Sequence, residues 1–119
     1  WQTNCNQGKD SDKEAFGKWV TEIKQEFRKH DLLLSAAVSP SKTIIDAGYD
    51  IKAMTDNLDW ISVMTYDYHG QWDKKTGHVA PMYEHPDDDF YYFNMNYSIN
   101  YWIDGGVPRR KIVLGMPMY

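Results

Sequence analysis

The side chains that could do chemistry gather in the middle of the chain, where residues 64–72 read MTYDYHGQW. Tyr66, Asp67, His69 and Trp72 place a phenol, a carboxylate, an imidazole and an indole within seven residues. Flat aromatic faces cover the apolar faces of pyranose rings, while carboxylates and hydroxyl groups bind the equatorial hydroxyls. This mixture favours a sugar-binding site. A second interpretation stays open, in which Tyr66 and Trp72 are ordinary core residues.

The helices that must position this cluster can be predicted from the spacing of apolar residues. An apolar stripe predicts a helix over about 12–30, and residues 11–14 have the form of a capping box at its start. Two further helices are predicted over 49–58 and 90–104, the second ended by two glycines and a proline.

Short runs of apolar and small residues over 32–38, 60–66 and 111–115 predict three strands. Their nearly continuous apolar character is typical of strands that are buried on both faces of a sheet. A long loop is predicted from about 67 to 89. The MTYDYHGQW run lies at the carboxyl end of the strand predicted over 60–66. In a barrel, the carboxyl ends of the strands carry the active site.

The predicted order of helix, strand, helix, strand, helix, strand is typical of parallel βα units and of an α/β fold. The first helix lacks a strand and the last strand lacks a helix, so we expect both ends to be cut within a larger architecture. A (β/α)8 TIM barrel takes about 250 residues, so the chain would be a partial barrel. The alternative is a small doubly wound sheet. It loses support because neither GxGxxG nor GxxxxGK[ST] occurs.

Composition excludes several other classes of protein. The 119 residues carry 13 Lys and Arg against 17 Asp and Glu, and the net charge of −4 argues against nucleic-acid binding. No apolar run approaches the roughly 18 residues of a membrane span. Aromatic residues reach 15%, which is high. Among them, Trp19 and Trp102 lie on helical apolar stripes and are expected in the core.

Metal and cofactor sites are not expected. Cys5 is the only cysteine, which excludes an internal disulfide and a cysteine-based zinc site. It is either a free thiol or the partner of a cysteine elsewhere, and both readings stay open. The spacing of His69, His78 and His85 fits no metal motif, so we expect them, with residues 87–89, in a solvated loop.

Three segments carry a resemblance to a known family. Residues 64–70, MTYDYHG, resemble the sixth-strand motif of family 18 glycoside hydrolases, the chitinases. Residues 33–38 with 46–49 resemble the fifth-strand region, and residues 111–119 are similar to the seventh strand, which runs Gly-Met-Pro-x-Tyr. The resemblance covers essentially all of residues 1–119 and is nearest to the moulting chitinases of arthropods. It implies one fragment of a catalytic TIM-barrel domain, without an internal domain boundary.

The resemblance implies hydrolysis of β-1,4-linked N-acetylglucosamine by substrate-assisted retaining catalysis, an exception to the two-carboxylate scheme. Tyr66 and Asp67 are the implied catalytic residues, with the Tyr66 hydroxyl holding the acetamido group of the substrate. The family's acid is the Glu that ends Asp-x-x-Asp-x-Asp-x-Glu, and no such motif occurs here. The implied position of this Glu is just before Trp1, so we expect the isolated segment to be inactive.

The resemblance also implies five substrate-binding residues. Ala37 and Met64 would shape the floor around the acetamido methyl group. Trp72 would stack on a sugar on the leaving-group side, and Met116 and Tyr119 would form a wall of the −1 subsite.

The implied partner is chitin or its oligosaccharides, in a secreted protein. Asn96 begins a glycosylation sequon, which agrees with secretion but arises often by chance. The alternative function is that of a chitinase-like lectin, which keeps the scaffold and the aromatic residues but replaces the acid. Tyr66 and Asp67 favour an enzyme, although lectins can keep both.

Overall fold

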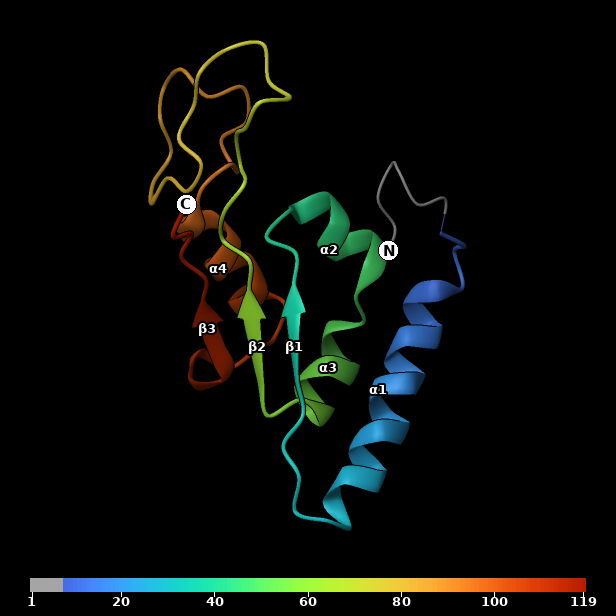
Figure 1. Cartoon of the computed structure of the whole chain (residues 1–119). Coiled ribbons are helices and arrows are strands. Elements are labelled where there is room, and N and C mark those ends of the chain that lie inside the picture. Colours follow the sequence, from blue (N-terminus) through green and yellow to red (C-terminus); the bar gives the residue numbers. More distant parts are fainter. Residues whose placement is uncertain (1–7) are drawn as a thin grey trace.

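The fold is built on one parallel sheet, seen in a computed structural model that describes residues 8–119 (Figure 1). Its strands are β1 (Ser35–Val38), β2 (Trp60–Val63) and β3 (Ile112–Leu114), and they lie side by side in chain order. A doubly wound sheet reverses its strand order at a switch point, whereas barrel strands follow one another in sequence. The described strands are parallel and show no reversal, so the predicted α/β fold is confirmed. Their order agrees with a partial barrel and gives the doubly wound alternative no support.

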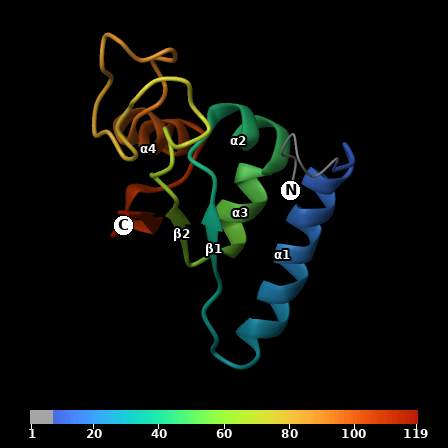
Figure 2. The same cartoon turned by 45° about the horizontal axis from the view of Figure 1, so that its top comes forward.

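Helices precede and connect the strands and cover one face of the sheet (Figures 1 and 2). They are α1 (Asp12–Arg28), α2 (Lys42–Gly48), α3 (Ile51–Asn57), α4 (Met95–Asp104) and the short 3-10 helix η1 (Arg109–Lys111). Both views show the loop between β2 and α4 extending beyond the carboxyl ends of the strands.

The core lies between the sheet and these helices. Val38 and Val63 point from β1 and β2 into a cluster with Ile45 of α2, Met54 of α3 and Trp102 of α4, and all five are fully buried. The indole nitrogen of Trp102 donates to the carbonyl oxygen of Ser39 at 3.1 Å, so α4 is tied to the end of β1. The prediction that Trp102 is a core residue is confirmed.

The opposite face of the sheet is open. Ser35, Ala37 and Val113 are exposed, and the register places Ala37 and Val113 on either side of Ser62. The prediction that the strands are buried on both faces is therefore wrong for the described residues, because helices cover only one face. In a closed barrel the second face is filled by side chains from the other strands.

Two helix predictions need correction. The helix predicted over 49–58 is confirmed as α3, but a further short helix, α2, precedes it. Helix α2 was missed because Thr43, Ile44 and Ile45 are β-branched and disfavour helix. Helix α4 begins at Met95 rather than at residue 90. Its start is fixed by Asn94, whose side-chain oxygen accepts a hydrogen bond from the Tyr97 amide at 2.8 Å.

Helix α1 also departs from prediction. The capping box is wrong, because Ser11 has helical backbone angles and its side chain caps nothing. Glu14 pairs instead with Lys18, at 2.7 Å. The prediction of a buried Trp19 is wrong as well: its side chain is 58% exposed and packs only along the helix surface against Phe16.

Candidate active site at the carboxyl ends of the strands

The chain that leaves β2 is bonded to both neighbouring strands. The Met64 amide donates to the Val38 carbonyl at 3.0 Å, which joins it to β1. The hydroxyl of Thr65, fully buried, donates to the Gly115 carbonyl at 2.6 Å, and the Gly115 amide donates to the Val63 carbonyl at 2.9 Å. These bonds hold residues 64–66 although the strand itself ends at Val63 rather than at residue 66 as predicted.

Tyr66 is positioned by tight turns and by a glycine. The amides of Thr65 and Tyr66 donate to the carbonyls two residues earlier, at 2.9 and 2.8 Å, which is the pattern of γ-turns. The Tyr66 ring lies against Gly115: a Cβ added there would lie 3.0 Å from Tyr66 Cε1 and 2.8 Å from the Val63 oxygen. Only glycine lets the chain after β3 approach the ring this closely.

Asp67 adopts a left-handed backbone conformation, with φ of 59°. Such a conformation is uncommon outside glycine, and strained residues of this kind cluster at functional sites. The Tyr119 hydroxyl donates to Asp67 Oδ1, which links the loop after β2 to the chain after β3. This bond to the Asp67 carboxylate raises the pKa of Tyr119 to about 12, so its hydroxyl keeps its proton.

The structure brings most of the predicted site residues to one edge of the sheet. Tyr66, Asp67 and Tyr119 lie there together, and Met64 is bonded to the end of β1 next to Ala37. Met116 follows Gly115 and is 72% exposed. Ala37 is exposed on the open face, so its methyl group is accessible.

Trp72 lies apart, in the loop after β2. Its indole is 63% exposed and rests over Gly70, where a Cβ would lie 2.4–2.7 Å from the ring atoms. It is therefore not a core residue, and the alternative interpretation of the sequence fails for this side chain. Its contact with a sugar stays a prediction.

Thr65 and Gly115 are positioning residues that the sequence did not predict. The glycine belonged to the Gly-Met-Pro-x-Tyr motif, which was a usable signal. Nothing in the sequence indicated the hydrogen bond between Thr65 and Gly115, which lie fifty positions apart.

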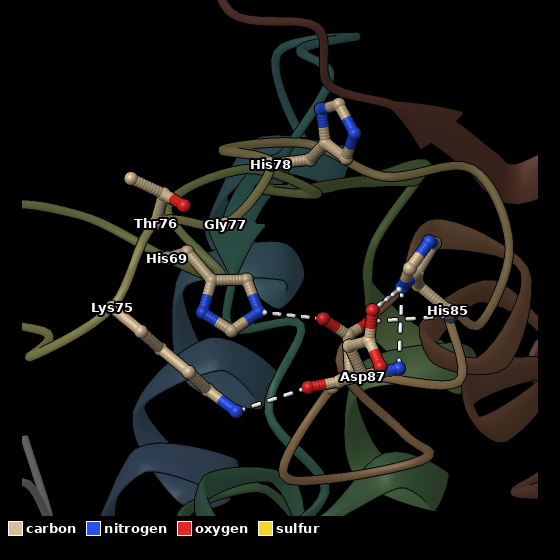
Figure 3. A pocket seen from close by; sticks show the side chains of 8 residues that line it. His69, Lys75, Thr76, Gly77, His78, His85 and Asp87 are labelled. Atoms are coloured by element: carbon tan, nitrogen blue, oxygen red, sulfur yellow. Dashed lines mark hydrogen bonds and ion pairs between the residues drawn. The ribbon is translucent and has the colours of Figure 1, made fainter.

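The histidine region differs from its prediction. His69 is 4% exposed, so the expectation of a solvated side chain is wrong for this residue, which carboxylates hold inside the loop. It borders a cavity of about 390 Å³ with Lys75, His78 and His85 (Figure 3). Within residues 8–119, no group of three or more His, Cys, Asp or Glu could hold a metal ion. Cys5 lies outside the described residues.

Comparison with known proteins decides the family. The family model described as "Glycosyl hydrolases family 18" matches residues 1–119. The chain belongs to glycosyl hydrolase family 18. It is 61% identical over 119 residues to "Probable chitinase 10" of Drosophila melanogaster, of which it spans 5%. Within the part of the chain that the structure describes, no helix is long and apolar enough to cross a membrane.

Solved structures of this family agree with the fold. Catalytic domain 2 of the Group II chitinase of Ostrinia furnacalis is 56% identical, with a TM-score of 0.94 over 98% of this chain and 30% of that one. A mutant of that domain has been solved with a bound N-acetylchitooligosaccharide. Human YKL-39, described as a pseudo-chitinase that retains chitooligosaccharide binding, is 32% identical, with a TM-score of 0.85 over 91% of this chain and 33% of that one.

Proposed function

We propose that this chain is part of a secreted chitinase that hydrolyses β-1,4 linkages between N-acetylglucosamine units. The observation that carries the proposal is the cluster of Tyr66, Asp67 and Tyr119 at the carboxyl edge of the strands. Family membership and the chitinase relatives support it. Because the chain spans only part of those relatives, the activity is proposed for the whole protein.

The proposed reaction is substrate-assisted. The acetamido oxygen of the −1 sugar attacks C1 and forms an oxazolinium ion, and the leaving sugar takes a proton from a Glu that the resemblance places before Trp1. Water then opens the oxazolinium ion, and the anomeric configuration is retained. The residues of this chain have to orient the acetamide, since an effective attack requires the oxygen in line with C1.

Tyr66 would orient that group through its hydroxyl. Its ring is fixed by the turns at Thr65 and by Gly115 after β3, so little freedom is lost when substrate binds. Asp67 would contact the −1 sugar and influence the proton affinity of the acid by its charge. Tyr119 keeps the Asp67 carboxylate in one orientation through its hydrogen bond.

The remaining predicted residues would bind substrate. Ala37 and Met64 would form the floor beneath the acetamido methyl group, and Met116 would extend the wall next to Tyr119. Trp72 offers an exposed indole face for a sugar on the leaving-group side. Asn96 is exposed near the start of α4, where a glycan would find room, which agrees with secretion.

The substitution Tyr66→Phe in the full-length protein tests the proposal. The ring is kept while the bond to the acetamide is lost, so kcat on chitin oligosaccharides should fall about 10-fold to 1000-fold, for one bond of roughly 1.5–4 kcal/mol. The matched control is Tyr83→Phe, at a tyrosine that is 68% exposed, and its kcat should equal that of the wild type. An unchanged kcat in Tyr66→Phe would remove Tyr66 from the catalytic residues.

A lectin is the second candidate, because YKL-39 shows that this family includes a pseudo-chitinase that still binds chitooligosaccharides. The two functions separate in one measurement on the full-length wild type. Release of reducing ends from a chitin oligosaccharide indicates the enzyme, whereas saturable binding without release indicates the lectin.

A further inference from the structure

His69 is a buried imidazole between two carboxylates. Its Nδ1 lies 3.2 Å from Asp73 Oδ2 in a hydrogen bond, and its Nε2 lies 3.2 Å from Asp88 Oδ1. The second contact lies within ion-pair distance but does not have hydrogen-bond geometry. Phe93 packs against the ring with centroids 5.6 Å apart, and Gly77 closes over it so tightly that a Cβ there would lie 2.4 Å away.

The imidazole of His69 lies between two segments of the loop. Both nitrogens of His69 face a carboxylate, and the Asp88 side chain is only 12% exposed. These two contacts join the loop of His69 to residues 85–89.

Asp73 connects His69 to the turn that contains Trp72. Its Oδ2 accepts from the Gly70 amide at 3.1 Å as well as facing His69, and its amide donates to the Gly70 carbonyl at 3.0 Å. Residues 70–73 therefore form a closed turn with Trp72 at its third position. The indole folds back over Gly70, the residue that Asp73 holds.

We propose that His69 is a positioning residue for Trp72, which it holds through Asp73 as a flat platform for a sugar ring of a chitin chain. The inference rests on the proposed function. A platform of this kind helps only if its plane is fixed before the sugar arrives, because ordering a mobile side chain on binding costs affinity. The buried contacts of His69 with Asp73 and Asp88 provide that order in a loop that has no helix or strand of its own.

The test compares His69→Gln, Trp72→Ala and the double variant in the full-length protein. Both single variants should raise KM for a hexameric chitin oligosaccharide about 3-fold to 30-fold. This lies within the interaction energies measured between residues in contact. A chitobioside with an aryl leaving group should be affected less than about 2-fold, since it does not reach the leaving-group subsites. The double variant should be no worse than Trp72→Ala alone. Additive losses, or equal losses on both substrates, would overturn the inference.

Two further variants separate positioning from general loop stability. Lys75→Met removes the other link between the same two segments, because Lys75 Nζ binds Asp89 Oδ1 at 2.7 Å and the Asp87 carbonyl at 3.0 Å. It should leave KM unchanged, and a rise equal to that of His69→Gln would contradict the inference. Gly70→Ala should displace the indole with the His69 contacts intact, and so raise KM as Trp72→Ala does.

A spectroscopic experiment monitors the Trp72 indole in the absence of substrate. Full-length protein labelled with 5-fluorotryptophan gives a fluorine signal that Trp72→Phe assigns. His69→Gln should shift or broaden that signal alone, and Lys75→Met should leave it in place. An unmoved signal in His69→Gln would overturn the positioning role. Absence of chitin binding in the wild type, with the fluorine result as expected, would instead defeat the proposed function.

Discussion

Gly115 fixes the geometry of the candidate active site because it has no side chain. Replacing it with Ala would force a methyl group to 2.8 Å from the Val63 oxygen and 3.0 Å from the Tyr66 ring, so the ring must shift. We expect kcat in the full-length protein to fall about 10-fold to 100-fold, because small misplacements of positioning groups are costly. Gly48→Ala is the matched control: a Cβ there meets no atom within 4 Å, and kcat should be unchanged. Equal kcat in both variants would contradict this account of Tyr66.

Tyr68 should make the stability of the protein fall as the pH becomes alkaline. Its hydroxyl lies 2.7 Å from Ser98 Oγ, Ser98 donates to the Pro40 carbonyl, and burial raises the pKa of Tyr68 to about 12. In the unfolded chain a tyrosine ionises near pH 10. The contribution of this group is therefore complete below about pH 10 and is lost as pH rises towards 12. The melting temperature of the full-length protein should fall over this interval, and should fall less steeply in Tyr68→Phe. Parallel curves for the two proteins would show that Tyr68 does not titrate in this way.

At the scale of elements, one buried ion pair ties α1 to the sheet. Lys24 Nζ lies 2.7 Å from Asp59 Oδ2, which also accepts from the Leu34 amide at 2.7 Å, and the Lys24 side chain is 10% exposed. The hydrogen bond from Lys24, followed by that from the Leu34 amide, lowers the pKa of Asp59. Asp59→Asn should destabilise the protein by about 1–3 kcal/mol, because it leaves a buried cation without its counter-charge.

The exposed pair of Lys52 and Asp56 is the control for this prediction. It has the same 2.7 Å separation, but the Lys52 side chain is 85% exposed. Solvent screens such a pair, so Asp56→Asn should leave the denaturation midpoint almost unchanged. Equal midpoint shifts in the two variants would mean that burial of Lys24 contributes nothing.

The elements were predictable where periodicity was strong. The apolar stripe of α1 and the short runs of β1, β2 and β3 gave the order of the fold, because a 3.6-residue period and buried strands leave clear patterns. Boundaries were not predictable in the same way. The end of β2 at Val63 depends on turns that close against β3, and the start of α4 depends on which Asn caps it.

At the scale of the whole molecule, parallel topology explains why distant residues form one site. Tyr66, Asp67 and Tyr119 could be grouped from the sequence because the carboxyl ends of neighbouring parallel strands meet at one edge. The contacts between loops could not be predicted from the sequence in this way. Nothing in the spacing of His69, Asp73 and Asp88 predicts that two carboxylates enclose a buried imidazole, since that depends on how a long loop folds back on itself. Their roles, like those of the site residues, stay predictions.

The open face of the sheet determines how residues 1–119 should behave when made alone. In the described part of the chain, β1 and β3 each have one neighbour in the sheet, and Leu33, Val113, Met116 and Met118 are all exposed. Unpaired strand edges and exposed apolar side chains promote association, whereas a closed barrel pairs every edge and fills this face. We expect the isolated segment to bind a hydrophobic dye, to aggregate and to lack a cooperative thermal transition, as measured by circular dichroism and light scattering. The full-length protein, as the control, should melt cooperatively and bind little dye. A sharp two-state melt of a monomeric segment would show that the helices on one face suffice for an independent fold.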